Sequence, residues 1–418
     1  MSKGAVVKDH NNLEIKSLYI SYDGVLEPLG QSQILPYLRR LSKRGIKFIL
    51  IAYDKKFYSE NKQKEKLFSE LAEDGIKWIN LRYHKKPPVL STIFDVIRGL
   101  IVCIIVAKRE RINTVHARSY VPSVIALVLK KIVKIKFIFD MRGFWADERI
   151  EGRLWKRKGA LYHFAKFLER QFLKEADAII VLTERAKEIV EDWGYDVNKV
   201  SIIPCCTDTD HFKFNREYYI EWRKKNNLTG KFIFVHTGSL EYWYMKGKML
   251  DYFRVAKEVM PEVHFLILTH SDKKGILKLI LDKGLDKEDF TILSVPFNEM
   301  PQYLSMVDAG IIFITPVFSK LASSPTKFAE YLSCALPVVI NERIGDLEDY
   351  VVKNNIGIVV RDSNDKHFDD NQYRQTFKGL LNLIKDENLK FRCRQTACNN
   401  FSLNIGVDKY YQIYSRLR

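Results

Sequence analysis

Short apolar runs alternate with longer amphipathic segments along almost the whole chain. A strand-length run, a helix-length segment and a second run are typical of βαβ units, whose strands form a parallel sheet. The pattern therefore predicts an α/β fold. In the first half, the predicted strands are 15–21, 46–53, 76–83, 114–119, 136–141 and 178–183. The segment 31–45 between the first two is predicted to be a helix.

The same rhythm starts again in the second half of the chain. The predicted strands there are 231–239, 263–270, 290–295, 309–316, 337–341 and 356–360. A chain of 418 residues is too long for one ordinary hydrophobic core and long enough for two. We predict two Rossmann-like, doubly wound parallel-sheet domains, 1–205 and 206–401, facing each other across a cleft. A terminal helix at about 402–418 is expected to pack back on the first domain.

In doubly wound folds, ligands bind at the carboxyl ends of the parallel strands, where backbone amides and helix N-termini converge. Functional residues are therefore expected directly after the predicted strands. The formal net charge of +17 predicts an anionic partner: nucleic acid, a phosphorylated metabolite or a membrane surface. No aromatic-basic signature of a nucleic-acid-binding module is found, so no nucleic-acid partner is predicted.

The cysteines and the apolar runs indicate where in the cell the protein is expected. The six cysteines lack paired metal-ligand spacing and lie in apolar contexts, which is typical of reduced thiols in a cytoplasmic protein. The N-terminal segment 1–16 has no apolar region of the secretory type. The longest apolar run, 100–107, is far shorter than the ~20 residues of a membrane span. It predicts a buried helix in a protein that is soluble or at most peripheral to a membrane.

The segment 323–340, SSPTKFAEYLSCALPVVI, predicts a short helix followed by a buried strand. Ser323 or Ser324 is suited to the N-cap, and Pro325 to the first helical position. One helical stripe is expected to face the core, and a second set of residues the opposite side. The core stripe consists of Phe328, Leu332 and Ala335. The opposite set consists of Thr326, Lys327 and Glu330.

Lys327 and Glu330 carry the chemistry of this segment. A helix N-terminus with free amides and an adjacent lysine suits a diphosphate. A carboxylate one turn further along accepts hydrogen bonds from a vicinal diol such as ribose. The alternative is an exposed Lys–Glu pair three residues apart, which contributes only a few tenths of a kcal/mol.

The segment resembles the nucleotide-sugar-binding signature of retaining glycosyltransferases of family 4, in the variant with Ser-x-Pro-x-Lys-x-x-Glu-Tyr-Leu before Pro-Val-Val. The resemblance implies the GT-B fold and a donor site that includes Ser324, Pro325 and Thr326. Glu330 stands where the family's glutamate contacts the nucleotide ribose. Ala322 stands where many members carry a second glutamate, so the donor sugar must be contacted by other groups.

Three further segments of the first half resemble the same family. The segment 21–45 is similar to its first strand, glycine loop and first helix, with Gly24 and Gly30 allowing close approach of a phosphate or sugar. The alternative for these glycines is a plain turn. Their spacing is not the Gly-x-Gly-x-x-Gly of dinucleotide binding.

The segments 115–119 and 139–149 each follow a predicted strand. His116 matches a cleft histidine that contacts donor sugar or acceptor, although a histidine at a strand end is more often structural. Arg118 and Arg142 are suited to bidentate bonds with phosphate or carboxylate. Three acids are candidates to orient an acceptor hydroxyl, with a salt-bridged loop as the alternative. They are Asp140, Asp147 and Glu148.

The segment 236–249, HTGSLEYWYMKGKM, resembles the family's loop after the first strand of the nucleotide domain. Gly238 and Ser239 fall in this loop, with Ser239 where many members carry an arginine. Lys246 is expected to reach the diphosphate through a longer loop, or Lys327 to replace it. The aromatic residues 242–244 are candidates to stack on a base or sugar, or to cap the loop.

The triplet Asp208-Thr209-Asp210 suggests manganese ligands, but 202–212 resembles the family's interdomain linker instead. We assign it a structural role and predict neither metal nor cofactor. The segment 155–174 predicts a basic amphipathic helix, whose apolar stripe is Leu161, Phe164, Ala165, Leu168 and Phe172. It is either a solvated surface helix or a contact with an anionic membrane, where each Lys or Arg contributes ~1 kcal/mol.

The resemblance spans nearly the whole chain and implies a retaining hexosyltransferase of surface polysaccharide or glycan biosynthesis. It would move a sugar from a nucleoside diphosphate to a saccharide or lipid-linked acceptor, by front-face attack in which the departing phosphate takes the acceptor proton. The expected location is the cytoplasm, with possible peripheral attachment to the membrane. A catalytically silent nucleotide-sugar sensor and a nucleotide-sugar epimerase remain alternatives. The choice between uracil and guanine and the oligomeric state stay open.

Overall fold

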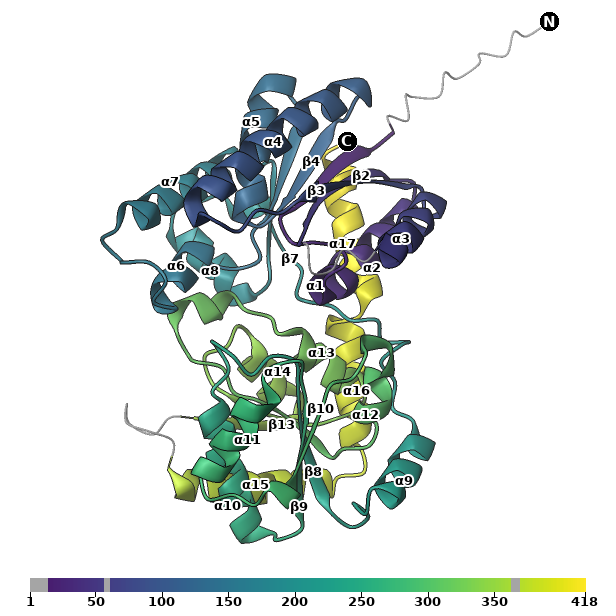
Figure 1. Cartoon of the computed structure of the whole chain (residues 1–418), viewed down its shortest axis with the longest axis vertical. Coiled ribbons are helices and arrows are strands. Elements are labelled where there is room, and N and C mark those ends of the chain that lie inside the picture. The colour runs from purple at the N-terminus through teal and green to yellow at the C-terminus, as the bar shows by residue number, and fades with distance from the viewer. Residues whose placement is uncertain (1–13, 56–60, 362–368) are drawn as a thin grey trace, which may run out of the picture. The chain divides into compact units, whose positions relative to one another are not determined.

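A computed structural model describes residues 14–55, 61–361 and 369–418 (Figure 1). Most of the N-terminal segment that was searched for a secretory signal lies outside these residues. The chain divides into two compact units. The first contains Met1–Asp140, Glu169–Ile179 and Val407–Arg418, and the second contains Met141–Leu168 and Ile180–Gly406.

The first sheet has seven strands in the order β3-β2-β1-β4-β5-β6-β7. β1 pairs in parallel with β2 and β4, with Tyr19 opposite both Leu50 and His116. The strands are β1 Lys16–Ser21, β2 Lys47–Asp54, β3 Ile76–Arg82, β4 Thr114–Arg118, β5 Lys136–Asp140, β6 Ala178–Val181 and β7 Val200–Ile202. Six of them coincide with predicted strands. β7 was missed because three residues are too short to form a recognisable apolar run.

Eight helices of the described chain lie between the strands of this sheet or follow β6. They are α1 Pro28–Gln33, α2 Leu35–Ser42, α3 Asn61–Glu73, α4 Pro88–Arg109, α5 Tyr120–Val133, α6 Trp145–Glu151, α7 Ala160–Glu175 and α8 Glu184–Asp192. The predicted single helix 31–45 is in fact divided between α1 and α2. The division falls at Ile34 (φ −123°), because Pro36 cannot donate a helical hydrogen bond to an earlier turn.

The second sheet has six strands in the order β10-β9-β8-β11-β12-β13, all of them at predicted positions. The strands are β8 Phe232–Thr237, β9 Val263–Leu268, β10 Phe290–Leu293, β11 Ala309–Ile312, β12 Val338–Asn341 and β13 Gly357–Val360. The helices that accompany this sheet are α9 Arg216–Lys225, α10 Lys246–Val259, α11 Lys273–Asp282, α12 Met300–Leu304, α13 Thr326–Ser333, α14 Leu347–Asn354, α15 Asp370–Ile384 and α16 Leu389–Asn400. The last helix, α17 Leu403–Arg416, lies mostly in the first unit.

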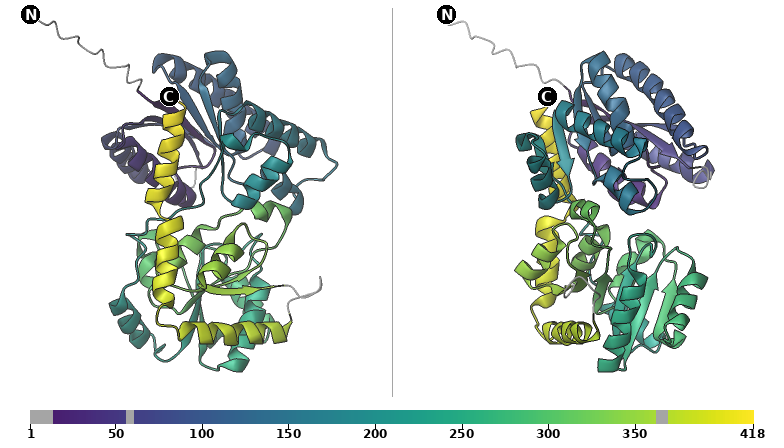
Figure 2. Two further views of the ribbon diagram at one scale, coloured as in Figure 1. Left: turned by 180° about the vertical axis from the view of Figure 1, so that it is seen from behind. Right: turned by 90° about the vertical axis from the view of Figure 1, so that its left-hand side faces the viewer.

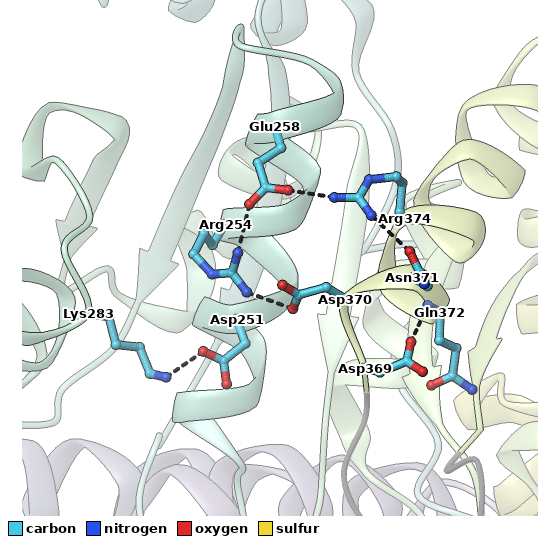
Figure 3. A network of polar contacts seen from close by, with 9 residues as sticks. All are labelled: Asp251, Arg254, Glu258, Lys283, Asp369, Asp370, Asn371, Gln372 and Arg374. Atoms are coloured by element: carbon cyan, nitrogen blue, oxygen red, sulfur yellow. Dashed lines mark hydrogen bonds and ion pairs between the residues drawn. The ribbon is translucent and has the colours of Figure 1, made fainter.

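Helices cover both faces of each sheet (Figures 1 and 2). In the second sheet, one apolar cluster joins α13, α14 and α16 to the strands, and the other joins α10, α11 and α15. Surface ion pairs also connect α10 to α15 (Figure 3): Arg254 bonds Asp370 at 2.6 Å and Arg374 bonds Glu258 at 2.7 Å. Because these pairs are solvent-exposed, apolar burial rather than charge holds the two helices together.

Strand order reverses beside the first strand of each series, between β1 and β4 and between β8 and β11. Such a reversal separates the loops that follow the two neighbouring strands and leaves a binding position at their carboxyl ends. The prediction of two doubly wound, Rossmann-like parallel sheets is therefore confirmed. The predicted boundary at 205/206 lies between β7 and β8 and stays a prediction, as does the range given for each domain.

One prediction about helix burial is wrong. The run 100–107 belongs to α4 and is not fully buried, because Ile101 and Ile105 are 55% and 59% exposed. Among the described residues, α4 is the one helix whose length and apolar composition would suffice to cross a membrane. The apolar stripe of α7 is divided: Leu161 and Phe164 are 41% and 59% exposed, while Ala165 and Phe172 are buried. The choice between a solvated surface helix and a membrane contact stays open.

Candidate functional site

The side chain of Lys327 lies at the strand-order reversal of the second sheet. Lys327 is the second residue of α13 and only 7% exposed. Its Nζ lies 3.7 Å from the centroid of the Tyr244 ring and 3.2 Å from Nε2 of His236. A Cβ added to Gly238 would lie 3.7 Å from the same Nζ. The ammonium group is therefore held between an aromatic face and an imidazole, beside the exposed glycine that follows β8.

His236 fixes the position of this ammonium group. Its Nδ1 lies 3.1 Å from the carbonyl oxygen of Ile311, and its Nε2 lies 3.3 Å from the carbonyl oxygen of Ser239 and 3.2 Å from Nζ of Lys327. These contacts hold the ring in place between β11 and the loop after β8. Burial, with a further contribution from the charge of Lys327, lowers the pKa of His236 to about 3. The imidazole is thus neutral at physiological pH.

Lys327 and Glu330 have opposite pKa shifts with one main cause. Burial lowers the pKa of Lys327 to about 7, although the nearby Glu330 carboxylate acts in the other direction. Burial raises the pKa of Glu330 to about 7, and the charge of Lys327 partly offsets this rise. Near neutral pH, each group therefore changes its charge readily. A bound anion would favour charged Lys327, and hydroxyl donors would favour ionised Glu330.

Tyr331 positions the start of α13 against the sheet. Its buried hydroxyl accepts a hydrogen bond from the backbone N of Thr237 at 2.8 Å and lies 3.1 Å from Oγ1 of the same residue. A Cβ on Gly310 would lie 2.1 Å from Cδ2 of Tyr331, so the ring occupies the space that a side chain in β11 would need. The ring and hydroxyl thereby link α13 to both strands at the reversal point.

The predicted cap of α13 is wrong. The helix begins at Thr326 with Pro325 as the N-cap, and no described side chain caps its first turn. Ser324 instead accepts a hydrogen bond through Oγ from the backbone N of Cys205 at 3.1 Å. Its hydroxyl therefore fixes the 204–206 segment and leaves the first amides of α13 without a side-chain acceptor.

The core stripe of α13 is confirmed, since Phe328, Leu332 and Ala335 are all buried. Lys327, predicted on the side opposite this stripe, is itself buried, and its side chain lies beside the end of β8. The alternative of an ordinary exposed Lys–Glu pair therefore does not describe this helix. The reason is that the loop after β8 covers the first turn of α13. A helical wheel describes one helix alone and cannot show this cover.

The loop after β8 contributes the other predicted donor residues of this unit. Gly238 has φ +83° and, like Ser239, is exposed beside Lys327. Ser239 Oγ accepts from the backbone N of Glu241 at 3.1 Å. Lys246 is exposed and is the first residue of α10. Among the described residues, the Lys327 ammonium contacts Tyr244 and His236 rather than Lys246. Its predicted contact with the diphosphate stays a prediction.

The aromatic residues of that loop have separate roles. Tyr244 lies under Lys327, whereas the ring of Trp243 lies 3.9 Å from Nζ of Lys320, itself 5% exposed. Tyr242 is 80% exposed. Sequence reasoning missed His236 and Lys320. The signal for His236 was its position near the end of a buried strand, two residues before Gly238.

His116, Arg118 and Asp140 form a buried polar cluster at the ends of β4 and β5. One carboxylate oxygen of Asp140 lies 3.6 Å from both His116 Nε2 and Arg118 Nη1. His116 Nδ1 lies 2.7 Å from the Tyr414 hydroxyl, and Tyr410 donates to Asp140 at 3.3 Å. Because both tyrosines belong to α17, the cluster fastens this helix to the first sheet. The predicted substrate contacts of the three residues stay predictions.

Gly24 and Gly30 permit close approaches within the protein itself. A Cβ on Gly24 would lie 2.4 Å from Oδ1 of Asp54, and one on Gly30 would lie 2.4 Å from the carbonyl oxygen of Gly24. Both glycines are buried, and Gly30 lies inside α1. The two residues therefore shape the loop after β1 by packing against it, and their contact with a ligand stays a prediction.

The charged loop 139–149 is mostly engaged in protein contacts. Arg142 has φ +60° and donates through Nη2 to Sγ of Cys205 at 3.1 Å. Asp147 accepts from the Tyr162 hydroxyl at 2.9 Å and from Lys166 at 3.1 Å, and Glu148 pairs with Lys320. The alternative of a salt-bridged loop thus describes Asp147 and Glu148. Phosphate binding by Arg142 stays a prediction.

Asp208 has the structural role expected of the 208–210 triplet, since its Oδ1 accepts from the backbone N of Asp210 at 3.0 Å. In the part of the chain that the structure describes, no group of three or more metal-ligating side chains comes together. Metal independence stays a prediction. All six cysteines are free and five of them are buried, in line with reduced thiols.

A sequence model of the family described as Glycosyltransferase Family 4 matches residues 33–211. This match covers less than half of the chain and lies outside the Lys327 segment. No curated protein matches the sequence.

Solved structures resemble nearly the whole fold. A glycosyltransferase from Rickettsia africae ESF-5 is 16% identical with a TM-score of 0.71, and 97% of this chain and 99% of that chain are covered. Sucrose-phosphate synthase from Thermosynechococcus elongatus is 14% identical with a TM-score of 0.71, over 96% and 99% of the two chains. Anabaena Alr3699/HepE in complex with UDP and glucose is 12% identical with a TM-score of 0.70, over 96% and 99%. Glycosyltransferases are therefore among the proteins that share this fold.

Proposed function

We propose that this protein is a glycosyltransferase that moves a sugar from a nucleoside-diphosphate sugar to a saccharide or lipid-linked acceptor, with retention of anomeric configuration. The observation that carries the proposal is the buried Lys327 ammonium at the uncapped start of α13, beside Gly238. A cation and helix amides at a strand-order reversal suit a diphosphate. The match to Glycosyltransferase Family 4 and the UDP complex of the Anabaena protein support this choice of ligand.

In the proposed reaction, the bond between the anomeric carbon and the diphosphate oxygen breaks, and negative charge develops on the departing diphosphate. Lys327 and the first amides of α13 stabilise this charge, with Lys246 as a second cation at the loop. Glu330 accepts hydrogen bonds from the ribose. The acceptor oxygen forms the new glycosidic bond to the anomeric carbon on the face that the diphosphate leaves, and the departing phosphate takes the proton of that hydroxyl. Because the attack is on the front face, no covalent intermediate with the protein is needed. We also propose that the reaction needs no metal and takes place in the cytoplasm.

Two other functions share this site. A catalytically silent nucleotide-sugar sensor would bind the donor without turnover. An epimerase would convert the donor without an acceptor. Incubating the purified protein with radiolabelled donor, with and without a mixed pool of saccharide and lipid-linked acceptors, separates the three. Acceptor-dependent transfer supports our proposal, whereas acceptor-independent conversion of the intact donor supports an epimerase. Unchanged donor that nevertheless binds tightly supports the sensor.

Nucleotide-sugars are expected to stabilise the protein against heat. A ligand at 100 times its dissociation constant adds about 2.7 kcal/mol to the free energy of unfolding, which raises the melting temperature measurably. A thermal-shift screen of UDP- and GDP-sugars should therefore produce one clear responder class. If no nucleotide-sugar raises the melting temperature above the response to inorganic sulfate, the donor proposal is wrong.

The number of protons taken up or released when the donor binds is expected to depend on pH. At pH 8.5, Lys327, with its pKa near 7, is mostly neutral, so an approaching diphosphate raises this pKa and a proton is taken up. At pH 5.5, Glu330 is mostly protonated, so ribose hydroxyls that favour its ionised form release a proton. UDP-glucose suits the test because both of its phosphates are esterified and do not titrate in this range.

Titration calorimetry in two buffers of different ionisation enthalpy measures this linkage. We expect uptake at pH 8.5 and release at pH 5.5. Lys327→Met should abolish only the uptake, and Glu330→Gln only the release. Binding without any proton exchange at either pH would mean that the donor contacts neither side chain.

A further inference from the structure

Helix α4 is fixed to the first unit along one face made mainly of small residues. Asp95 is fully buried and accepts hydrogen bonds from the Tyr22 hydroxyl and the backbone N of His84, both at 2.9 Å. A Cβ on Gly99 would lie 1.9 Å from the hydroxyl oxygen of Tyr53, so this tyrosine packs directly against the helix backbone. The inward positions recur every four residues, at Ser91, Asp95, Gly99, Cys103 and Ala107.

The opposite face of α4 is apolar and open to solvent. Its exposed residues recur at intervals of three or four and form one continuous stripe. They are Val89 at 45%, Leu90 at 66%, Ile93 at 50%, Phe94 at 54%, Ile97 at 53%, Ile101 at 55% and Ile105 at 59% exposed. We call these seven residues the apolar face of α4. A helix of 22 residues is about 33 Å long, so the stripe is far larger than the scattered apolar residues of an ordinary surface.

Cations lie at both ends of this face. Lys85 and Lys86 precede the helix, and Lys108 and Arg109 end it, all four exposed. The one acidic residue within α4 is the buried Asp95, and Glu110, which follows the helix, is paired with Lys77 at 2.7 Å. The apolar face therefore has positive charge at each end and no exposed carboxylate along its length.

We propose that the apolar face of α4 binds the surface of an anionic lipid bilayer, with the helix lying in the plane of the membrane. Apolar side chains would enter the boundary between headgroups and acyl chains, while the terminal lysines and Arg109 contact anionic headgroups. The helix would not span the bilayer, because spanning would break the hydrogen bonds of Asp95 with Tyr22 and His84 and the packing of Gly99 against Tyr53. The membrane contact expected of α7 stays a separate prediction, since Leu161 and Phe164 of that helix are also exposed.

The charges argue against a second copy of the chain as the occupant of this face. Two copies related by a twofold axis would place Lys85 and Lys86 of one beside either the same pair or Lys108 and Arg109 of the other. Like charges would meet in both arrangements, at a cost to the association. An anionic surface meets the same four cations with opposite charge.

Vesicle flotation of the full chain tests this inference independently of the donor reaction. We expect flotation with phosphatidylcholine vesicles that contain phosphatidylglycerol, and much less with phosphatidylcholine alone. The double variant Ile97→Glu/Ile101→Glu should lower the partition coefficient more than about tenfold, because two carboxylates would face the acyl chains. Phe391→Glu on α16, where Phe391 is 63% exposed, is the matched control and should float like the wild type.

Further measurements keep the test decisive. Circular dichroism and the donor-induced thermal shift should be unchanged in Ile97→Glu/Ile101→Glu, which separates lost membrane binding from lost folding or lost donor binding. Lys85→Glu/Lys86→Glu should reduce binding to anionic vesicles only. The inference is overturned if the double apolar variant floats normally, or if only Phe164→Glu on α7 stops flotation. It is equally overturned if the wild type does not bind vesicles and light scattering shows a dimer that Ile97→Glu/Ile101→Glu dissociates.

Discussion

Replacing Lys327 with methionine or alanine is expected to lower turnover by two to three orders of magnitude. A single well-placed donor to a developing oxyanion is typically worth ~3–4 kcal/mol in a site shielded from water. Lys327 meets these conditions, since it is 7% exposed and oriented by His236 at 3.2 Å. Steady-state kinetics with saturating donor measure the effect, which should fall mainly on kcat because charge develops on the diphosphate only as the glycosidic bond breaks.

Methionine is the more informative replacement because it preserves the buried stem and removes only the charge. Lys353→Ala, at an exposed position of α14, is the matched control and should leave kcat unchanged. His236→Ala should give an intermediate loss, because the ammonium keeps its charge but loses the ring that lies 3.2 Å from it. A Lys327→Met enzyme with a normal kcat would place the diphosphate elsewhere and contradict the proposed site.

Truncating Tyr331 to alanine is expected to lower the free energy of unfolding of the second unit by about 3–5 kcal/mol, as is typical of large-to-small changes at buried aromatic residues. The ring is fully buried and packs against Gly310, which has no side chain to occupy the space that truncation would leave. Tyr331→Phe retains the ring and removes the acceptor for the Thr237 amide, a loss of about 1–3 kcal/mol. Urea unfolding, followed by the tryptophans of this unit, measures both changes.

Tyr242→Ala is the control for these two variants. Tyr242 is 80% exposed in the neighbouring loop, and its removal should change the free energy of unfolding by less than about 0.5 kcal/mol. If Tyr331→Phe is as stable as the wild type, its hydroxyl does not hold α13 to β8. The orientation of Lys327 would then need another cause.

The strands were predictable because buried parallel strands are nearly continuous apolar runs. Twelve predicted runs correspond to β1–β6 and β8–β13, and only the three-residue β7 was missed. The family resemblance drew attention to Lys327 and Glu330, and the residues alone left an exposed pair as an alternative. The helical wheel was misleading for Lys327 because it describes one helix and not the loop from β8 that covers its first turn.

The α4 helix shows the opposite error. The apolar run 100–107 predicted a buried helix, since hydrophobicity alone indicates that a segment avoids water. It does not indicate which neighbour excludes the water. Small residues at every fourth position allow one face of α4 to pack closely on the unit, and the larger residues are thereby left on the outside.

The sequence by itself determined the α/β class, the two series of strands and the elements that carry the candidate residues, because local apolar periodicity fixes secondary structure. The tertiary structure alone decided that His236 and Tyr244 enclose Lys327, that α17 covers His116, and that one face of α4 is open. These outcomes depend on contacts between residues as many as 298 positions apart, as between His116 and Tyr414. No local pattern encodes such contacts, because they arise only when the strands assemble into sheets and bring distant loops together.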